Sequence, residues 1–266
     1  MAKSFIYDSI GFSEAPLKAG TVAEDFAGSY TYTAAEAQIT NEHRATDMSI
    51  GSAITSFDSN DAIRFDLGSG TSGTANVIAV HFNGAENSEF ELYAGDEPSA
   101  LGNDTLVSTV FSVSSSGGWN IFTFTETTID SNSRWWHFVS TLETIENITE
   151  IIIGTKYDFD INFDLSNKIG EEFGTDIVTS YGGNEYSNKR HEPKTTWDWN
   201  WSFLTSSQRT SLDDLNSTVQ DHKKFIYSED GTTGPFHYVR MTKPMNFTEV
   251  ASSIYSTSVS LREQLA

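Results

Sequence analysis

Side chains that could bind calcium alternate with apolar ones in the segment YDFDINFDL. Those with the spacing of the first ligands of a calcium loop are Asp158, Asp160, Asn162 and Asp164. Phe163 stands where such a loop needs glycine, and Ile169 stands where its bidentate glutamate belongs. A period of two explains every residue of the segment as a strand with one solvated face. We therefore expect neither a bound metal nor a cofactor.

Other reactive residue types occur without the spacing that catalysis requires. None of the six histidines forms an HxH or HExxH pair, and no Gly-x-Ser-x-Gly turn exposes a serine nucleophile. The 37 acidic residues make close carboxylate pairs inevitable, so such pairs do not indicate a glycosidase. The absence of cysteine excludes disulfides and thiolate sites. We expect no catalytic residues and no enzymatic activity.

Tryptophans are the side chains best suited to stack on a sugar ring. The candidates are Trp119, Trp135 and Trp136. Since Trp135 and Trp136 are adjacent, a strand would turn them to opposite faces, and we expect at least one of them in the core.

A second aromatic group follows the polar loop GGNEYSNKRHEPK. In TTWDWNWSF, the alternation puts Trp197, Trp199, Trp201 and Phe203 on one face. This stripe is either a core stripe or a buried subunit interface, because aromatic residues are enriched in both. For the second alternative, the candidate assembly residues are Trp197, Trp199 and Trp201, together with Lys189 and Arg190 of the preceding loop.

The net charge of −21 narrows the range of partners. An acidic surface repels the phosphate backbone, so we expect no nucleic-acid partner. The sequence shows no apolar stretch of about 18 residues and no signal-peptide core, which predicts folding in a cytoplasm without membrane insertion.

Strand signals separated by Gly, Ser, Asn and Asp clusters predict an all-β chain. The expected strands are 62–67, 77–82, 90–94, 106–113, 119–124, 135–140, 148–154, 225–228, 236–241 and 257–261. This spacing predicts an antiparallel jelly-roll sandwich over residues 41–155, after an N-terminal arm or edge strands in 1–40. A second β-rich region, 156–266, should carry one short helix near 208–223, capped by Ser206 or Ser207 and ending in His222, Lys223 and Lys224.

Residues 40–155 resemble discoidin-type, galactose-binding-like jelly rolls. In that family a turn of the type Ala-Thr-Asp precedes a strand ending in Asp-Leu-Gly, and an Arg-aromatic strand precedes the last core strand. The matching positions are Ala45–Asp47, Asp66–Gly68 and Arg134–Trp135. The chain departs from the family by carrying Phe57 where a Trp is usual and by lacking a cysteine pair, and its loops match no sugar-binding set.

Residues 185–245 resemble a region shared by tail and baseplate proteins of tailed bacteriophages. That region has an Arg-rich loop, an alternating Trp/Phe strand, a short helix and a strand around a Pro-Phe step. The resemblance implies a structural virion component, made in the host cytoplasm and assembled with its own copies or other tail proteins, with host glycan as a candidate partner. The alternative is a carbohydrate-binding or adhesive β-sandwich module at a cell surface.

Overall fold

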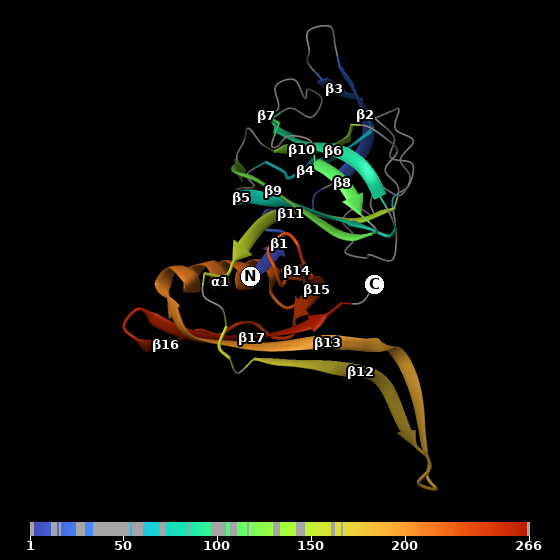
Figure 1. The fold of residues 1–266 in the computed structure, drawn as a ribbon, viewed down its shortest axis with the longest axis vertical. Helices are drawn as coiled ribbons and strands as arrows, with labels where there is room; N and C mark the ends of the chain where they lie inside the picture. The colour runs from blue at the N-terminus through green and yellow to red at the C-terminus, as the bar shows by residue number, and fades with distance from the viewer. Residues whose placement is uncertain are drawn as a thin grey trace. The chain divides into compact units, whose positions relative to one another are not determined.

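Strands make up most of the computed structural model of this protein (Figure 1). The structure describes residues 3–11, 15, 17–24, 30–33, 54, 61–69, 73–84, 86–96, 105–106, 111–115, 117–129, 134–141, 147–160, 163–165 and 167–264. The chain divides into two units. Unit 1 contains the residues up to Phe5, Tyr157–Gly231 and Pro235–Leu265, and unit 2 contains Ile6–Lys156 and Thr232–Gly234.

Unit 2 is a sandwich of two sheets. One sheet has the order β11-β5-β9, and the other has the order β3-β2-β4-β10-β6-β7, with β8 also pairing β6. The strands are β2 (Leu17–Glu24), β3 (Tyr30–Thr33), β4 (Asp61–Asp66), β5 (Gly73–Phe82), β6 (Glu86–Gly95), β7 (Thr105–Leu106), β8 (Phe111–Ser115), β9 (Gly118–Ile129), β10 (Trp135–Ser140) and β11 (Ile148–Asp158). A further strand, β1 (Ser4–Tyr7), begins in unit 1 and ends in unit 2.

The core of unit 2 forms because alternate residues of facing strands point inward. Phe90 of β6 contacts Phe138 of β10 with ring centroids 4.5 Å apart, and it also contacts Phe122 of β9 in the other sheet. Near the N-terminus, Phe5, Tyr7 and Ile10 are buried.

Unit 1 is built on a sheet with the order β12-β13-β17-β15-β14, in which β16 also pairs β17. Its elements are β12 (Lys168–Thr179), β13 (Glu185–Thr205), α1 (Ser206–Val219), β14 (Lys224–Ser228), β15 (Phe236–Met241), β16 (Thr248–Ala251) and β17 (Ile254–Glu263). The registered pairs of both units are antiparallel. The predicted all-β, antiparallel fold class with one short helix is therefore confirmed.

The aromatic stripe of β13 is shorter than its sequence pattern predicts. The indoles of Trp197, Trp199 and Trp201 are buried, but Phe203 is 72% exposed and Leu204 is buried in its place. The register of β13 against β17 shifts between Trp201 and Leu204. An irregularity of this kind changes the face on which the following side chains lie, so the predicted position of Phe203 on the buried face is wrong.

The described residues of the alternating segment that follow Asp158 are not in a strand. β11 ends at Asp158, and residues 159, 160, 163 and 164 are outside strands. Phe163 stacks on Trp199 with centroids 4.6 Å apart and planes 5° apart, and Phe159 packs edge-on against Trp201. Phe159 and Phe163 point inward because their rings cover the indoles of β13. This packing produces the alternation of apolar and polar residues without strand pairing.

The polar segment 182–194, which the sequence predicts as a loop, belongs mostly to β13. Glu185 begins the strand and pairs with Thr179 of β12. The ladder then runs to Asp198 opposite Lys168, with two register shifts near Gly174. Cross-strand pairing therefore overrides the local turn signal of Gly, Asn and Pro.

The predicted helix is present, but it begins two residues earlier and ends four residues earlier than predicted. Thr205, rather than Ser206 or Ser207, is the N-cap, and its hydroxyl accepts from the Gln208 amide while the Gln208 side chain accepts from the Thr205 amide. Gln220 follows the last helical residue with φ of 53°, so His222, Lys223 and Lys224 lie beyond the helix. In the described part of the chain, no helix has the length and hydrophobicity to span a bilayer.

Candidate functional site

The candidate assembly residues lie in two different environments. Trp197, Trp199 and Trp201 are 3%, 1% and 3% exposed and pack within unit 1, where Trp199 contacts Tyr227 at 4.6 Å between ring centroids. The structure thus places the stripe in the core of the unit, which is one of the two alternatives that the sequence allows. The role of this stripe in assembly stays a prediction.

The two basic candidates are exposed on the far part of β13. Lys189 Nζ lies 2.6 Å from Glu192 Oε1, and Arg190 pairs with Asp176 of β12. Such exposed pairs contribute little to folding stability because water and salt screen them. The assembly role of these two residues is likewise a prediction.

In unit 2, an aromatic and polar corner forms where β5 ends and β9 begins. The register pairs His81 with Trp119, and both side chains are partly exposed. Their rings meet edge to face, with centroids 5.1 Å apart and planes at 69°. Asn120 follows on β9, and Thr149 of β11 contacts His81. We call these four side chains the Trp119 corner.

Hydrogen bonds fix the imidazole of His81 in the Trp119 corner. The Thr149 hydroxyl donates to the His81 carbonyl oxygen at 3.2 Å, and its Oγ1 lies 2.6 Å from the His81 Nδ1. The donor at the Nδ1 contact depends on the ring tautomer, so Nε2 can either donate or accept a hydrogen bond. Burial lowers the pKa of His81 below its usual range, so the ring is neutral at pH 7.

Two close turns hold the strands of the Trp119 corner. Asn83 N–H donates to the Asn147 carbonyl at 2.9 Å, and Gly117 has φ of 108°. A Cβ at residue 117 would lie 2.9 Å from the carbonyl oxygen of Gly84, so the approach of the two turns requires glycine. The turn before β9 is thus held close to the turn after β5, which brings Trp119 beside His81.

The other two candidate tryptophans are separated as the alternation predicts. Trp136 is fully buried in the sandwich core, whereas Trp135 is partly exposed on the opposite face of β10. The guanidinium carbons of Arg64 and Arg134 lie 4.8 and 4.7 Å from the centre of the Trp135 ring. The two cations occupy the surface that a sugar would need, so Trp135 is the poorer stacking platform.

Two of the motifs behind the jelly-roll resemblance meet in the structure. Arg134 donates from Nε and Nη2 to the two carboxylate oxygens of Asp66, at 2.6 and 2.7 Å. This bidentate pair lowers the pKa of Asp66. The ion pair joins the ends of β4 and β10, so its role is structural. Residues 45–47 and Phe57 lie outside the described residues.

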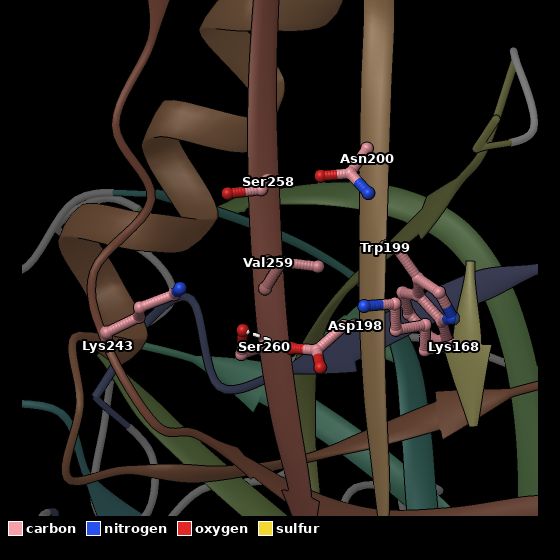
Figure 2. Close-up of a pocket in the computed structure, with 8 residues that line it drawn as sticks. All are labelled: Lys168, Asp198, Trp199, Asn200, Lys243, Ser258, Val259 and Ser260. Atoms are coloured by element: carbon pink, nitrogen blue, oxygen red, sulfur yellow. Dashed lines mark hydrogen bonds between the residues drawn. The ribbon is translucent and has the colours of Figure 1, made fainter. Parts of the chain in front are cut away.

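Unit 1 has a polar depression of about 280 Å³ on the face of its sheet opposite the indoles (Figure 2). It is lined by Lys168, Asp198, Trp199, Asn200, Lys243, Ser258, Val259 and Ser260. Ser260 donates to Asp198, and the two lysines lie on opposite sides of this carboxylate in Figure 2. The depression offers hydrogen bonds, but the only aromatic residue of its lining, Trp199, buries its ring on the other face.

Sequence patterns miss the partners in both places. Strand register alone brings His81 beside Trp119, and Lys168 beside Asp198. His81 and Trp119 each lie near the end of a strand-like run in the sequence, which is a weak signal, and Asp198 lies inside such a run. Among the residues that the structure describes, no group of three or more His, Asp or Glu side chains is arranged to hold a metal ion.

Comparisons with known proteins return structural overlaps only. No family model and no curated protein matches the chain. Among solved structures, it overlaps the CBM32 of AlyQ in complex with 4,5-unsaturated mannuronic acid, at 20% identity and a TM-score of 0.35 over 52% of this chain and 92% of the module. It also overlaps chitosan-binding module 1 of a chitosanase/glucanase from Paenibacillus sp. IK-5, at 18% identity and a TM-score of 0.37 over 56% and 99%.

A third overlap is with a CBM32 from Clostridium perfringens in complex with GalNAc-β-1,3-galactose. The identity is 13% and the TM-score 0.37, over 55% of this chain and 99% of the module. Neither this structure nor the two above is described as a phage tail or baseplate protein. All three TM-scores are below 0.5, so the fold assignment rests on the strand order and the core of each unit.

Proposed function

We propose that this protein is a non-enzymatic, carbohydrate-binding β-sandwich protein, with the Trp119 corner as its sugar site. The observation that carries the proposal is the pairing of a partly exposed indole with a neutral imidazole at one end of a rigid sandwich. The predicted place in a virion is a separate proposal and would be tested by finding the protein in purified particles.

The Trp119 corner has both kinds of contact that a pyranose requires. The indole face carries partial negative charge and attracts the C–H groups on one side of a sugar ring. His81 Nε2 can exchange a hydrogen bond with a sugar hydroxyl beside the indole. Both act from paired strands, so little conformational entropy is lost on binding.

The charge of the chain favours a neutral sugar over an acidic one. A net charge of −21 raises the energy of bringing a uronate or sialate to the surface. The Trp119 corner has no lysine or arginine among its four side chains to offset this repulsion. We therefore expect neutral glycans to bind more tightly than acidic glycans of the same size, most clearly at low salt.

The test compares glycan binding by the full chain and by Trp119→Ala, using a glycan array followed by calorimetry. A buried aromatic contact at the centre of a binding site is worth about 2 kcal/mol or more, so the affinity should fall about 30-fold. Trp135→Ala is the matched control, because its ring is covered by two arginines and its removal should leave the affinity unchanged.

Three outcomes would contradict the proposal. The full chain could bind no glycan, Trp135→Ala could lose binding while Trp119→Ala keeps it, or acidic glycans could bind best. Thermal unfolding of both variants shows whether any loss of binding comes from loss of the fold.

A further inference from the structure

Exposed apolar side chains are concentrated on the hairpin of β12 and β13. Of the nine large hydrophobic residues that the structure shows as exposed, this hairpin carries Ile169, Phe173, Ile177, Val178, Tyr181, Tyr186 and, near the end of β13, Phe203. Figure 1 shows its far part extending beyond the end of β17. A two-stranded ribbon with so little burial is marginally stable by itself, which indicates that another surface covers it.

The free edge of the hairpin is β12. This strand is terminal in the sheet order of unit 1, and within the described residues no strand pairs with its outer edge. Its twelve residues run from Lys168 to Thr179 without proline. The backbone N–H groups on the outer edge of the strand are therefore all available in principle for pairing. A long, exposed edge of this kind is a template for adding another strand.

The two faces of β12 differ in chemistry. Glu172 pairs with Arg262 at 2.6 Å, and Asp176 pairs with Arg190, so the charges on one face are neutralised within the unit. On the other face, Ile169, Phe173 and Ile177 follow each other at intervals of four residues and are 68%, 68% and 63% exposed. The apolar row is the part of β12 that lacks a covering surface in the described structure.

We propose that β12 is the interface of a homodimer, in which it pairs antiparallel with β12 of a second copy about a twofold axis at Phe173. A twofold interface must be self-complementary. Around Phe173 the apolar row is symmetric, because Ile169 and Ile177 lie four residues on either side. The axis therefore places Ile169 opposite Ile177 of the second copy and Phe173 opposite its own equivalent.

The charges of the strand fit the same register. It places Glu171 opposite Thr175, Glu172 opposite Gly174 and Lys168 opposite Val178 of the second copy, so no two like charges face each other.

The hairpin is also less subject to mutual repulsion than the chain as a whole. Residues 168–194 carry four basic side chains (Lys168, Lys189, Arg190, Lys194) against five acidic ones, whereas the whole chain carries 16 against 37. Two copies approach at lowest electrostatic cost through this nearly neutral segment. A second copy presents the same nearly neutral segment, so it is the partner that the structure favours for the outer edge of β12.

The experiment uses disulfide formation between full-length chains, which have no cysteine of their own. Directly opposed residues of antiparallel strands have Cα atoms about 4.5–5.5 Å apart, within the range that a disulfide spans. Phe173→Cys should therefore form a covalent dimer on mild oxidation. Val178→Cys, on the opposite face and away from the axis, is the matched control and should stay monomeric on a denaturing gel.

A mixing experiment tests the register. Ile169→Cys and Ile177→Cys should each fail to cross-link alone, because each lies about 26 Å from its own equivalent in the dimer. The two variants mixed before oxidation should form the mixed dimer. By sedimentation, the dissociation constant of the dimer should rise at least 10-fold in Phe173→Lys relative to the unsubstituted chain. The same constant should be unchanged in Val178→Lys.

A monomer at all concentrations by sedimentation would overturn the proposal and assign the apolar row to a different protein. Cross-linking through Val178→Cys but not Phe173→Cys would overturn it as well. Neither result bears on sugar binding, since the Trp119 corner is in the other unit.

Discussion

At the scale of single residues, His81 makes the stability of the folded chain depend on pH. Burial lowers the pKa of His81 below its ordinary value because it disfavours the charged ring. The unfolded chain takes up a proton near the ordinary pKa of about 6.5, whereas the folded chain does so only at lower pH. The contribution of His81 to stability is therefore complete above pH 6.5 and is lost as the pH falls.

We predict that His81→Gln reduces the loss of unfolding free energy between pH 7 and pH 5. One group can change this free energy by at most about 1.4 kcal/mol per pH unit. Urea unfolding at several pH values measures it. His222→Gln is the control, since that residue is exposed to solvent in unit 1. Equal pH dependence in His81→Gln and in the unsubstituted chain would contradict the prediction.

At the scale of elements, β13 shows how a register shift divides an apparently uniform stripe. Trp199 contacts Phe5, Phe163 and Tyr227 in the core, while Phe203 lies after the shift and is exposed. Side chains of the same type in the same run thus have different energetic roles, because stability depends on burial and not on composition.

We predict that Trp199→Ala lowers the unfolding free energy of its unit by about 3–5 kcal/mol, since it removes a large buried ring. Phe203→Ala should change it by no more than about 0.5 kcal/mol, as an exposed substitution does. Urea unfolding followed by circular dichroism compares the two. Similar losses for both variants would show that Phe203 is also buried and that the observed register shift is not present in solution.

At the scale of the whole molecule, the net charge of −21 governs how copies approach each other. Salt screens the mean repulsion between acidic surfaces, and it also screens attractive ion pairs. An interface formed by an apolar row and backbone pairing contains no attractive ion pairs, so salt affects it only by screening the repulsion.

We therefore predict that raising the salt concentration from about 0.05 M to about 0.5 M tightens the proposed dimer. Analytical ultracentrifugation at each salt concentration measures its dissociation constant. A dimer that weakens with salt would instead be held by ion pairs, such as those the sequence suggests for Lys189 and Arg190.

The sequence by itself determined the fold class and most strand positions. Buried strands can be predicted from the local sequence, because alternating apolar residues bounded by turn residues are compatible with few other structures. Trp135 and Trp136 were separable for the same reason, since adjacent residues of a strand face opposite sides.

Only the tertiary structure decided which residues meet. The alternation at 158–164 comes from rings that cover Trp199, and the polar segment 185–194 becomes a strand through its pairing with β12. The Trp119 corner depends on the register of β9 against β5, which joins residues far apart in the chain. Such contacts carry no local signal, because cross-strand partners are selected by the packing of the whole unit.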